Sequence, residues 1–251
     1  MGLSVLAPGF EFIDKFGESG VVNQGAEADV VSWLTTGAVD EPAANGEVVY
    51  AWSSNGGDTD VDVAVSGRQL GALVDGAVNL NGATAVKCLT AAGDDMTAER
   101  IHRASASDAY SGNISFGNAG KTETWMQIAI GEGQTLACMM STSTGKKSFI
   151  ENYWADMIAS SAAAATAVIR LWTRADGSAL WVSKHKRIVT SDSHPQVTHN
   201  FKKPYPNKSG IPAGSDVKLT IKAVAKNVTV AAGFLMTSCW NRIDPYDYWV
   251  E

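Results

Sequence analysis

The chain is poor in cysteine: its 251 residues contain only Cys88, Cys138 and Cys239. An odd number of widely spaced cysteines excludes a complete disulfide framework. All of them lie in apolar segments, where an unpaired cysteine usually acts as a small buried side chain. A metal centre or a catalytic thiol would favour a nearby histidine, but no histidine is close in the sequence to any of the three cysteines. We therefore expect buried, unreactive thiols.

Long hydrophobic runs and catalytic motifs are absent as well. No segment approaches the roughly 18 to 20 apolar residues that cross a bilayer, so we expect no membrane association. Residues 1–20 have neither a basic start nor a long apolar core, so we expect no secretory signal. No serine lies in a nucleophile-elbow context, and the glycines between 112 and 117 lack a phosphate-loop lysine. We expect no enzyme, and no catalytic residue, metal or cofactor.

Positive charge is scarce in the first half of the chain. Residues 1–120 carry five basic and sixteen acidic side chains, a net charge of −11, whereas residues 121–251 carry fifteen and ten, a net charge of +5. One interpretation is a surface charge without function. The other is an electrostatic dipole that orients copies of the protein in an assembly, because complementary fields steer encounter and fix register.

The sequence does contain a series of short segments with alternating apolar residues. Side chains two apart in a strand point to the same face of the sheet, and the segment 216–223 follows this pattern. The residues expected to face a core are Val217, Leu219, Ile221 and Ala223, and those expected to face water are Lys218, Thr220 and Lys222. Two further segments, 167–173 and 179–183, flank a tight turn at 174–178 and predict a hairpin.

Strand-like segments continue on both sides of a glycine-rich break at 117–120. Upstream they cover 46–53, 59–66, 76–86, 101–106 and 113–116, with a tight turn at Asn81-Gly82. Downstream we count eight, at 124–130, 135–141, 147–158, 167–173, 179–189, 197–202, 216–224 and 228–237. Eight short strands in succession are typical of a jelly roll. The first 45 residues are weakly patterned.

The predicted fold class is all-β, with an N-terminal β-sandwich-like domain followed by a C-terminal jelly roll. The predicted parts are an N-terminal extension at 1–24, the β-sandwich-like domain at 25–118, the jelly roll at 121–238 and an aromatic C-terminal arm at 239–251. A jelly roll leaves sheet edges that oligomer contacts can cover. We therefore expect 121–238 to be the module through which a homo-oligomer forms.

Five segments carry a resemblance to a known class of proteins. They are VNLNGATAV at 78–86, ERIHRASASDAYSGNISFG at 99–117, GEGQTLACM at 131–139, VIRLWTRADGSALW at 168–181, and IPAGSDVKLTIKAV with VTVAAGF within 211–234. Over about residues 75–237 the chain resembles virion structural proteins of tailed bacteriophages, many of them marine. The first 45 residues and 241–251 fall outside it. The resemblance implies a non-enzymatic, multi-copy virion component that is assembled in the bacterial host cytoplasm.

Within that class, the sequence favours a capsid decoration or cement protein, or an accessory protein of the tail. Its expected partners are copies of itself and other virion proteins such as the major capsid protein. Two β-units in one chain also fit a double-jelly-roll major capsid protein. A third alternative is a glycan-binding receptor protein at the particle surface, which would need exposed aromatic side chains; Trp125, Trp172 and Trp181 are the strand tryptophans considered for it.

Two sets of residues are interface candidates. The first is basic and comprises Lys184, Lys186, Arg187, Lys202, Lys203 and Lys208. We expect it to meet an acidic protein surface, with Lys202, Lys203 and Lys208 as test positions; nucleic acid is not the expected partner, because the chain is acidic and aromatics do not interleave these cations. The second is the aromatic arm, with Trp240, Tyr246, Tyr248 and Trp249. It folds back on the chain's own sandwich or docks on a neighbouring subunit.

Two groups resemble metal ligands by residue type but not by spacing. The first is Asp192, His194 and His199, and the second is Asp58, Asp60 and Asp62. Histidines five apart in a strand point to opposite faces, so the first group predicts an exposed loop. The three aspartates share one strand face but lack the tight loop and bidentate glutamate of a calcium site. We interpret them as a solvated strand face.

Overall fold

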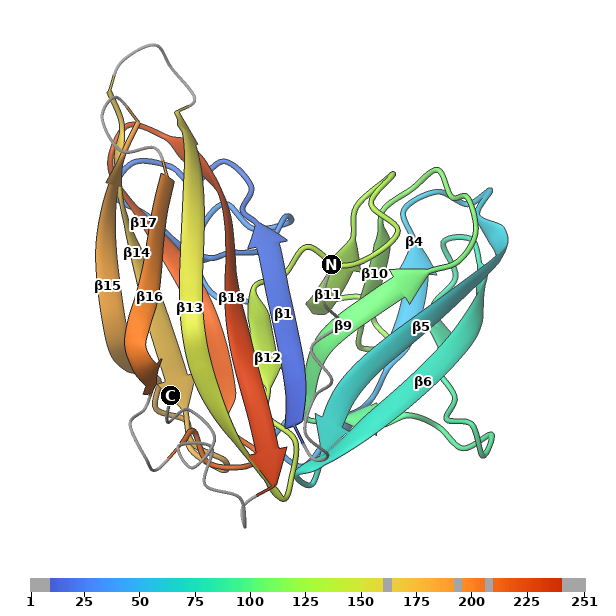
Figure 1. Ribbon diagram of the computed structural model, residues 1–251. Coiled ribbons are helices and arrows are strands. Elements are labelled where there is room, and N and C mark those ends of the chain that lie inside the picture. Colours follow the sequence, from blue (N-terminus) through green and yellow to red (C-terminus); the bar gives the residue numbers. More distant parts are fainter. Residues whose placement is uncertain (1–9, 160–163, 192–195, 206–209, 241–251) are drawn as a thin grey trace, which may run out of the picture.

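The structure is a computed structural model that describes residues 10–159, 164–191, 196–205 and 210–240. These residues form strands and connecting loops, without a helix, which confirms the all-β class. The strands build two units that lie side by side (Figure 1). The larger unit contains β1 and the strands from β12 onward, and the smaller unit contains β3 to β11.

The larger unit is a sandwich of two antiparallel sheets. One sheet has the order β1 (Phe10–Glu18), β18 (Val228–Trp240), β13 (Lys146–Ala159) and β16 (Gln196–Tyr205). The other has the order β12 (Met139–Ser141), β17 (Asp216–Ala225), β14 (Thr166–Arg174) and β15 (Val182–Thr190), and β2 (Glu27–Asp29) also pairs with β17. The core between the sheets includes Ile169, Leu219 and Phe234.

The pairing of these eight strands defines a jelly roll. In chain order the first strand pairs with the last, β1 with β18, and the second with the seventh, β12 with β17. The third pairs with the sixth, β13 with β16, and the fourth with the fifth, β14 with β15. Such nested antiparallel pairs are one long hairpin that has been rolled up, and two further pairs, β13 with β18 and β14 with β17, join the rolled strands into two sheets.

The smaller unit is inserted between the first and second strands of this jelly roll. Its strands are β3 (Glu47–Val48), β4 (Tyr50–Ser53), β5 (Thr59–Gln69), β6 (Ala72–Asn81), β7 (Val86–Lys87), β8 (Thr97–Ala98), β9 (Arg100–Ala106), β10 (Ile114–Gly117) and β11 (Thr124–Ile128). They form the sheets β11-β10-β4-β7, β6-β5-β9 and β3-β8. A separate apolar core lies among them and includes Val63, Phe116 and Trp125.

Two predicted assignments differ from the observed pairing. Residues 10–18 were assigned to an extension, but they are a jelly-roll strand that pairs along its whole length with β18. The segment 124–130 was counted in the jelly roll, but β11 pairs with β10 of the smaller unit. The jelly roll does have eight strands, but its first strand is β1 and not the segment at 124–130. Alternation of apolar residues indicates a strand and its two faces but not the strand with which it pairs. Both segments were assigned to the unit of their neighbours in the sequence, and this assignment was wrong.

The predicted hairpin is present, although its second strand starts later than expected. β14 and β15 pair in antiparallel fashion, and β15 begins at Val182 rather than at 179. Trp181 lies before β15, with the guanidinium carbon of Arg174 and the Nζ of Lys218 each 4.4 Å from its ring centroid. These cation–π contacts place Trp181 against the sheet, and the segment before Val182 does not join the hydrogen-bond ladder between β14 and β15.

The faces of β17 were predicted correctly on one side only. Val217, Leu219, Ile221 and Ala223 are fully buried in the core, as expected. Lys218 and Thr220 do not face water but are buried, because β2 and the segment around Trp181 cover the outer face of β17. The ammonium of Lys218 pairs with Asp29 at 2.7 Å, which compensates its desolvation.

Two smaller predictions also have outcomes. The three cysteines are buried, as expected, and they form no disulfide with one another in the described structure. Asp58 is not on a solvated strand face: it is buried before β5 and accepts hydrogen bonds from the Ser53 hydroxyl and the amides of Ser111 and Gly112. These bonds lower the pKa of Asp58 despite an opposing effect of desolvation. The residue anchors the loop before β10.

Candidate functional site

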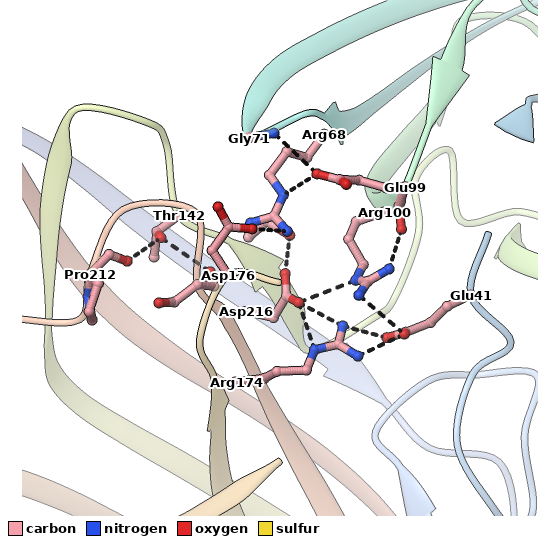
Figure 2. A network of polar contacts seen from close by, with 12 residues as sticks. Glu41, Arg68, Gly71, Glu99, Arg100, Thr142, Arg174, Asp176, Pro212 and Asp216 are labelled. Atoms are coloured by element: carbon pink, nitrogen blue, oxygen red, sulfur yellow. Dashed lines mark hydrogen bonds and ion pairs between the residues drawn. The ribbon is translucent and has the colours of Figure 1, made fainter. Parts of the chain in front are cut away.

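The two units meet at a cluster of ionised side chains, which we call the junction network (Figure 2). At its centre, Asp216 at the start of β17 accepts hydrogen bonds from Arg174 at 2.6 and 2.9 Å and from Arg100 at 3.2 Å. The Ser141 hydroxyl donates to its other oxygen at 2.5 Å. Arg100 comes from β9 of the smaller unit, whereas Arg174 and Asp216 belong to the jelly roll, so the network joins the two units.

Glu41 completes this half of the network. Its carboxylate accepts two hydrogen bonds from Arg174, at 2.7 and 2.8 Å, in the fork geometry that makes such pairs strong. Arg100 lies 3.7 Å from the same carboxylate. Burial disfavours the charge of Arg174, but the hydrogen bonds and charges of Glu41 and Asp216 outweigh it and raise the pKa of Arg174. The guanidinium is therefore fixed as a cation.

Arg68 forms the second half of the junction network. It lies on β5 of the smaller unit, is 2% exposed, and pairs with Glu99 at 3.1 Å and with Asp176 at 3.2 Å. Asp176 stands in the turn between β14 and β15, so this contact also crosses between the units (Figure 2). Glu99 further accepts a hydrogen bond from the amide of Gly71. Buried ion pairs fix geometry more than they add stability, and the network sets how the smaller unit sits on the jelly roll.

A second polar cluster closes the sandwich at its β15 and β16 edges. The imidazole rings of His185 on β15 and His199 on β16 stack with centroids 4.1 Å apart. The hydroxyl of Tyr153 lies 2.6 Å from His185 Nδ1, and a guanidinium nitrogen of Arg187 lies 2.7 Å from His199 Nδ1. Burial lowers the pKa of both histidines, and the charge of Arg187 lowers both further. Neutral rings thus bridge the two sheets.

The outer face of β15 is a basic and apolar strip at the end of its sheet. Lys184 and Lys186 are exposed there, and Ile188 beside them is 65% exposed. Leu180 and Val182, just before and at the start of the strand, are exposed as well. β15 ends its sheet, and among the described residues its ladder partner is β14 alone, so its other edge is open there to a partner strand. We call these residues the β15 strip.

Most of the predicted interface residues lie beyond what can be described. Lys208, Tyr246, Tyr248 and Trp249 are outside the described residues. Lys202 and Lys203 lie in β16 and Trp240 ends β18, but their side chains are not described. Asp192 and His194 also fall outside the described ranges. Of the basic set, the described members Lys184, Lys186 and Arg187 do come together on β15. The junction network was missed, since its members are scattered over the sequence.

The tryptophans bear on the glycan-binding alternative. Trp125 is buried in the core of the smaller unit, Trp172 donates a hydrogen bond to Thr220, and Trp181 is covered by Arg174 and Lys218. Among the described residues every tryptophan is buried or partly buried, so none offers a fully exposed ring for stacking. Within the same ranges, no group of three histidine, cysteine or acidic side chains has the spacing of a metal site. The described part of the chain also contains no helix that could cross a membrane.

Comparisons with known proteins give structural matches only. No protein-family model and no curated protein matches the sequence. Among solved structures, the chain is similar to the structure of infectious bursal disease virus Gx strain, with a TM-score of 0.29 and 9% identity over 95% of this chain and 74% of that one. The VP2 subviral particle of infectious bursal disease virus gives a TM-score of 0.28 and 10% identity over 94% and 74%. Scores this low establish neither a common fold nor a common function.

Proposed function

We propose that this chain is a non-enzymatic structural protein of a bacteriophage virion, most simply a capsid decoration or cement protein or an accessory protein of the tail, that acts as a symmetric homo-oligomer. The observation that carries the proposal is the jelly roll with nested pairs from β1·β18 to β14·β15. Jelly rolls occur in viral capsid domains, and also in lectins and cupins. The sequence resemblance to phage virion proteins favours the first of these uses.

The distribution of charge supports assembly from copies. Residues 31–137, which contain the smaller unit, carry five basic and thirteen acidic side chains, a net charge of −8. The remainder carries fifteen basic and thirteen acidic side chains, a net charge of +2, and its exposed cations include Lys184 and Lys186 of the β15 strip. Opposite net charges on two connected units steer the β15 strip of one copy toward the acidic unit of the next.

The arrangement of the units favours this role over a double-jelly-roll capsid protein. That alternative expects two consecutive jelly rolls, but here the smaller unit interrupts the larger one between β1 and β12. The smaller unit also nests three strand pairs, β3·β8, β4·β7 and β5·β6, where the larger nests four. An inserted unit that projects from a jelly roll is suited to contacts with neighbouring proteins.

Light scattering on the full-length chain tests the proposed contact. At low salt we expect particles heavier than one chain, and at about 1 M salt, where the screening length falls to about 3 Å, we expect monomers. The double variant Lys184→Glu and Lys186→Glu should be monomeric at low salt. The double variant Lys121→Glu and Lys226→Glu makes the same charge change at exposed positions off the strip and should still assemble. A monomeric wild-type chain at low salt would contradict the proposed homo-oligomer.

A further inference from the structure

A cavity of about 430 Å³ opens between the jelly roll and the smaller unit. β1 contributes Asp14 and Lys15 to its lining, β6 contributes Asp75, and β9 contributes His102 and Arg103. Its volume lies in the range of small-molecule pockets. The cavity is separate from the junction network and from the β15 strip, whose members do not line it.

The lining of this cavity contains two cations and a ring nitrogen without a hydrogen-bond partner. The Lys15 ammonium donates to the backbone carbonyl of His102 at 2.7 Å, but among the described residues no carboxylate pairs with Lys15 or with the exposed Arg103. His102 is buried, and its Nδ1 has no hydrogen-bond partner in the described structure. Burial, and to a lesser extent the charge of Arg103, lowers the pKa of Lys15 to about 8.

The same lining contains two carboxylates. Asp14 and Asp75 are exposed carboxylates, and the described structure gives neither an ion-pair partner. An ionised carboxylate accepts hydrogen bonds and donates none. A ligand that pairs with both sets of charges presents a carboxylate to Lys15 and Arg103 and hydroxyl or amide donors to the two aspartates.

We propose that this cavity binds an acidic sugar, a monosaccharide unit that carries one carboxylate and several hydroxyl groups. The carboxylate lies between Lys15 and Arg103, and the ring hydroxyls donate to Asp14 and Asp75. The unpartnered Nδ1 of His102 supplies a further polar contact to the ring. Recognition thus relies on polar side chains and not on stacked tryptophans. The proposal does not depend on how the protein assembles.

Saturation-transfer NMR on the full-length chain tests the ligand class with three kinds of probe. The acidic sugars are galacturonic, glucuronic and N-acetylneuraminic acid; galactose has the hydroxyls without the carboxylate, and acetate has the carboxylate without the hydroxyls. We expect transfer to at least one acidic sugar, and about tenfold weaker binding or none for galactose and acetate, because each lacks one set of charged hydrogen bonds. No transfer to any acidic sugar, or equal binding of galactose, would overturn the proposal.

Two variants locate the binding in the cavity. Arg103→Gln and Asp75→Asn change exposed side chains, so the fold should be retained, which the melting temperature checks. Each should weaken acidic-sugar binding about tenfold, as expected for loss of one charge-assisted contact. Lys184→Gln removes an exposed cation far from the cavity and should bind like the wild type. Wild-type affinity in Arg103→Gln and Asp75→Asn would place the ligand elsewhere and refute this site.

Discussion

At the scale of single residues, Asp216 matters most to the connection between the two units. It is 7% exposed and accepts hydrogen bonds from Arg174, Arg100 and Ser141. Without its carboxylate, the largely buried guanidinium groups of Arg174 and Arg100 would lose a counter-charge. Loss of one partner of a buried ion pair is far more costly than loss of an exposed pair.

We therefore predict that Asp216→Ala lowers the free energy of unfolding by about 3 kcal/mol. Asp95→Ala is the matched control, because Asp95 also pairs with a cation, Lys87 at 2.5 Å, but is 41% exposed. That change should cost about 0.5 kcal/mol. Urea denaturation followed by tryptophan fluorescence measures both. Equal losses in the two variants would show that the junction network is no more important than a surface pair.

His102 makes stability depend on pH. Burial, followed by the charge of Lys15, lowers its pKa from 6.5 to about 4 in the folded protein. Between these values the unfolded chain binds more protons than the folded chain, so the contribution of His102 is fully present above pH 6.5 and is lost as the pH falls toward 4. The shift corresponds to about 3 kcal/mol.

We predict that between pH 6.5 and pH 4 the free energy of unfolding falls by about 3 kcal/mol less in His102→Gln than in the wild type. Urea midpoints at several pH values measure this difference. Lys184→Gln serves as the control, because it removes an exposed charge on β15 and should keep the steep loss. If wild type and His102→Gln lose stability in parallel, the imidazole is not a buried neutral base.

At the scale of strands, β1 shows how a weakly patterned segment can be essential. It pairs with β18 over nine residue positions and supplies the first strand of the jelly roll. Gly17 permits its close approach, since a Cβ there would lie 2.4 Å from the Cys138 amide nitrogen. A jelly roll without its first strand leaves β18 exposed as an edge along its length.

We predict that a fragment spanning 138–240 does not fold cooperatively alone, and that a peptide covering residues 10–30 restores folding. The peptide supplies β1 and β2, which pair with β18 and β17. Circular dichroism during thermal unfolding measures the result with and without the peptide. A peptide of the same composition in scrambled order is the control. Cooperative unfolding of the fragment on its own would show that β1 is dispensable.

The strands themselves could be predicted from the sequence better than their partners. The alternation that places Val217 and Leu219 in the core is a local signal, and it located β17 correctly. The burial of Lys218 is not a local property, because it depends on Asp29 and Trp181, which approach from distant parts of the chain. The junction network could not be predicted for the same reason, because Glu41, Arg100 and Arg174 become neighbours only when the smaller unit is inserted into the jelly roll.

At the scale of the whole molecule, the charge division acquires a structural meaning. The smaller unit is the acidic one: residues 31–137 carry a net charge of −8 while the rest carries +2, although residues 1–30, which include β1 and β2, carry −4. The junction network holds these units in one orientation. A rigid arrangement of opposite fields is what repeated, directional contacts between copies require, because complementary charges fix register.

The most direct test of the particle role is the copy number of this chain in purified virions, measured by quantitative mass spectrometry against the major capsid protein. A decoration, cement or tail-accessory protein should be present in every particle at a copy number set by the particle symmetry. The Lys184→Glu and Lys186→Glu chain should be depleted from particles, while the Lys121→Glu and Lys226→Glu chain should be retained. Absence of the wild-type chain from purified virions would contradict the account.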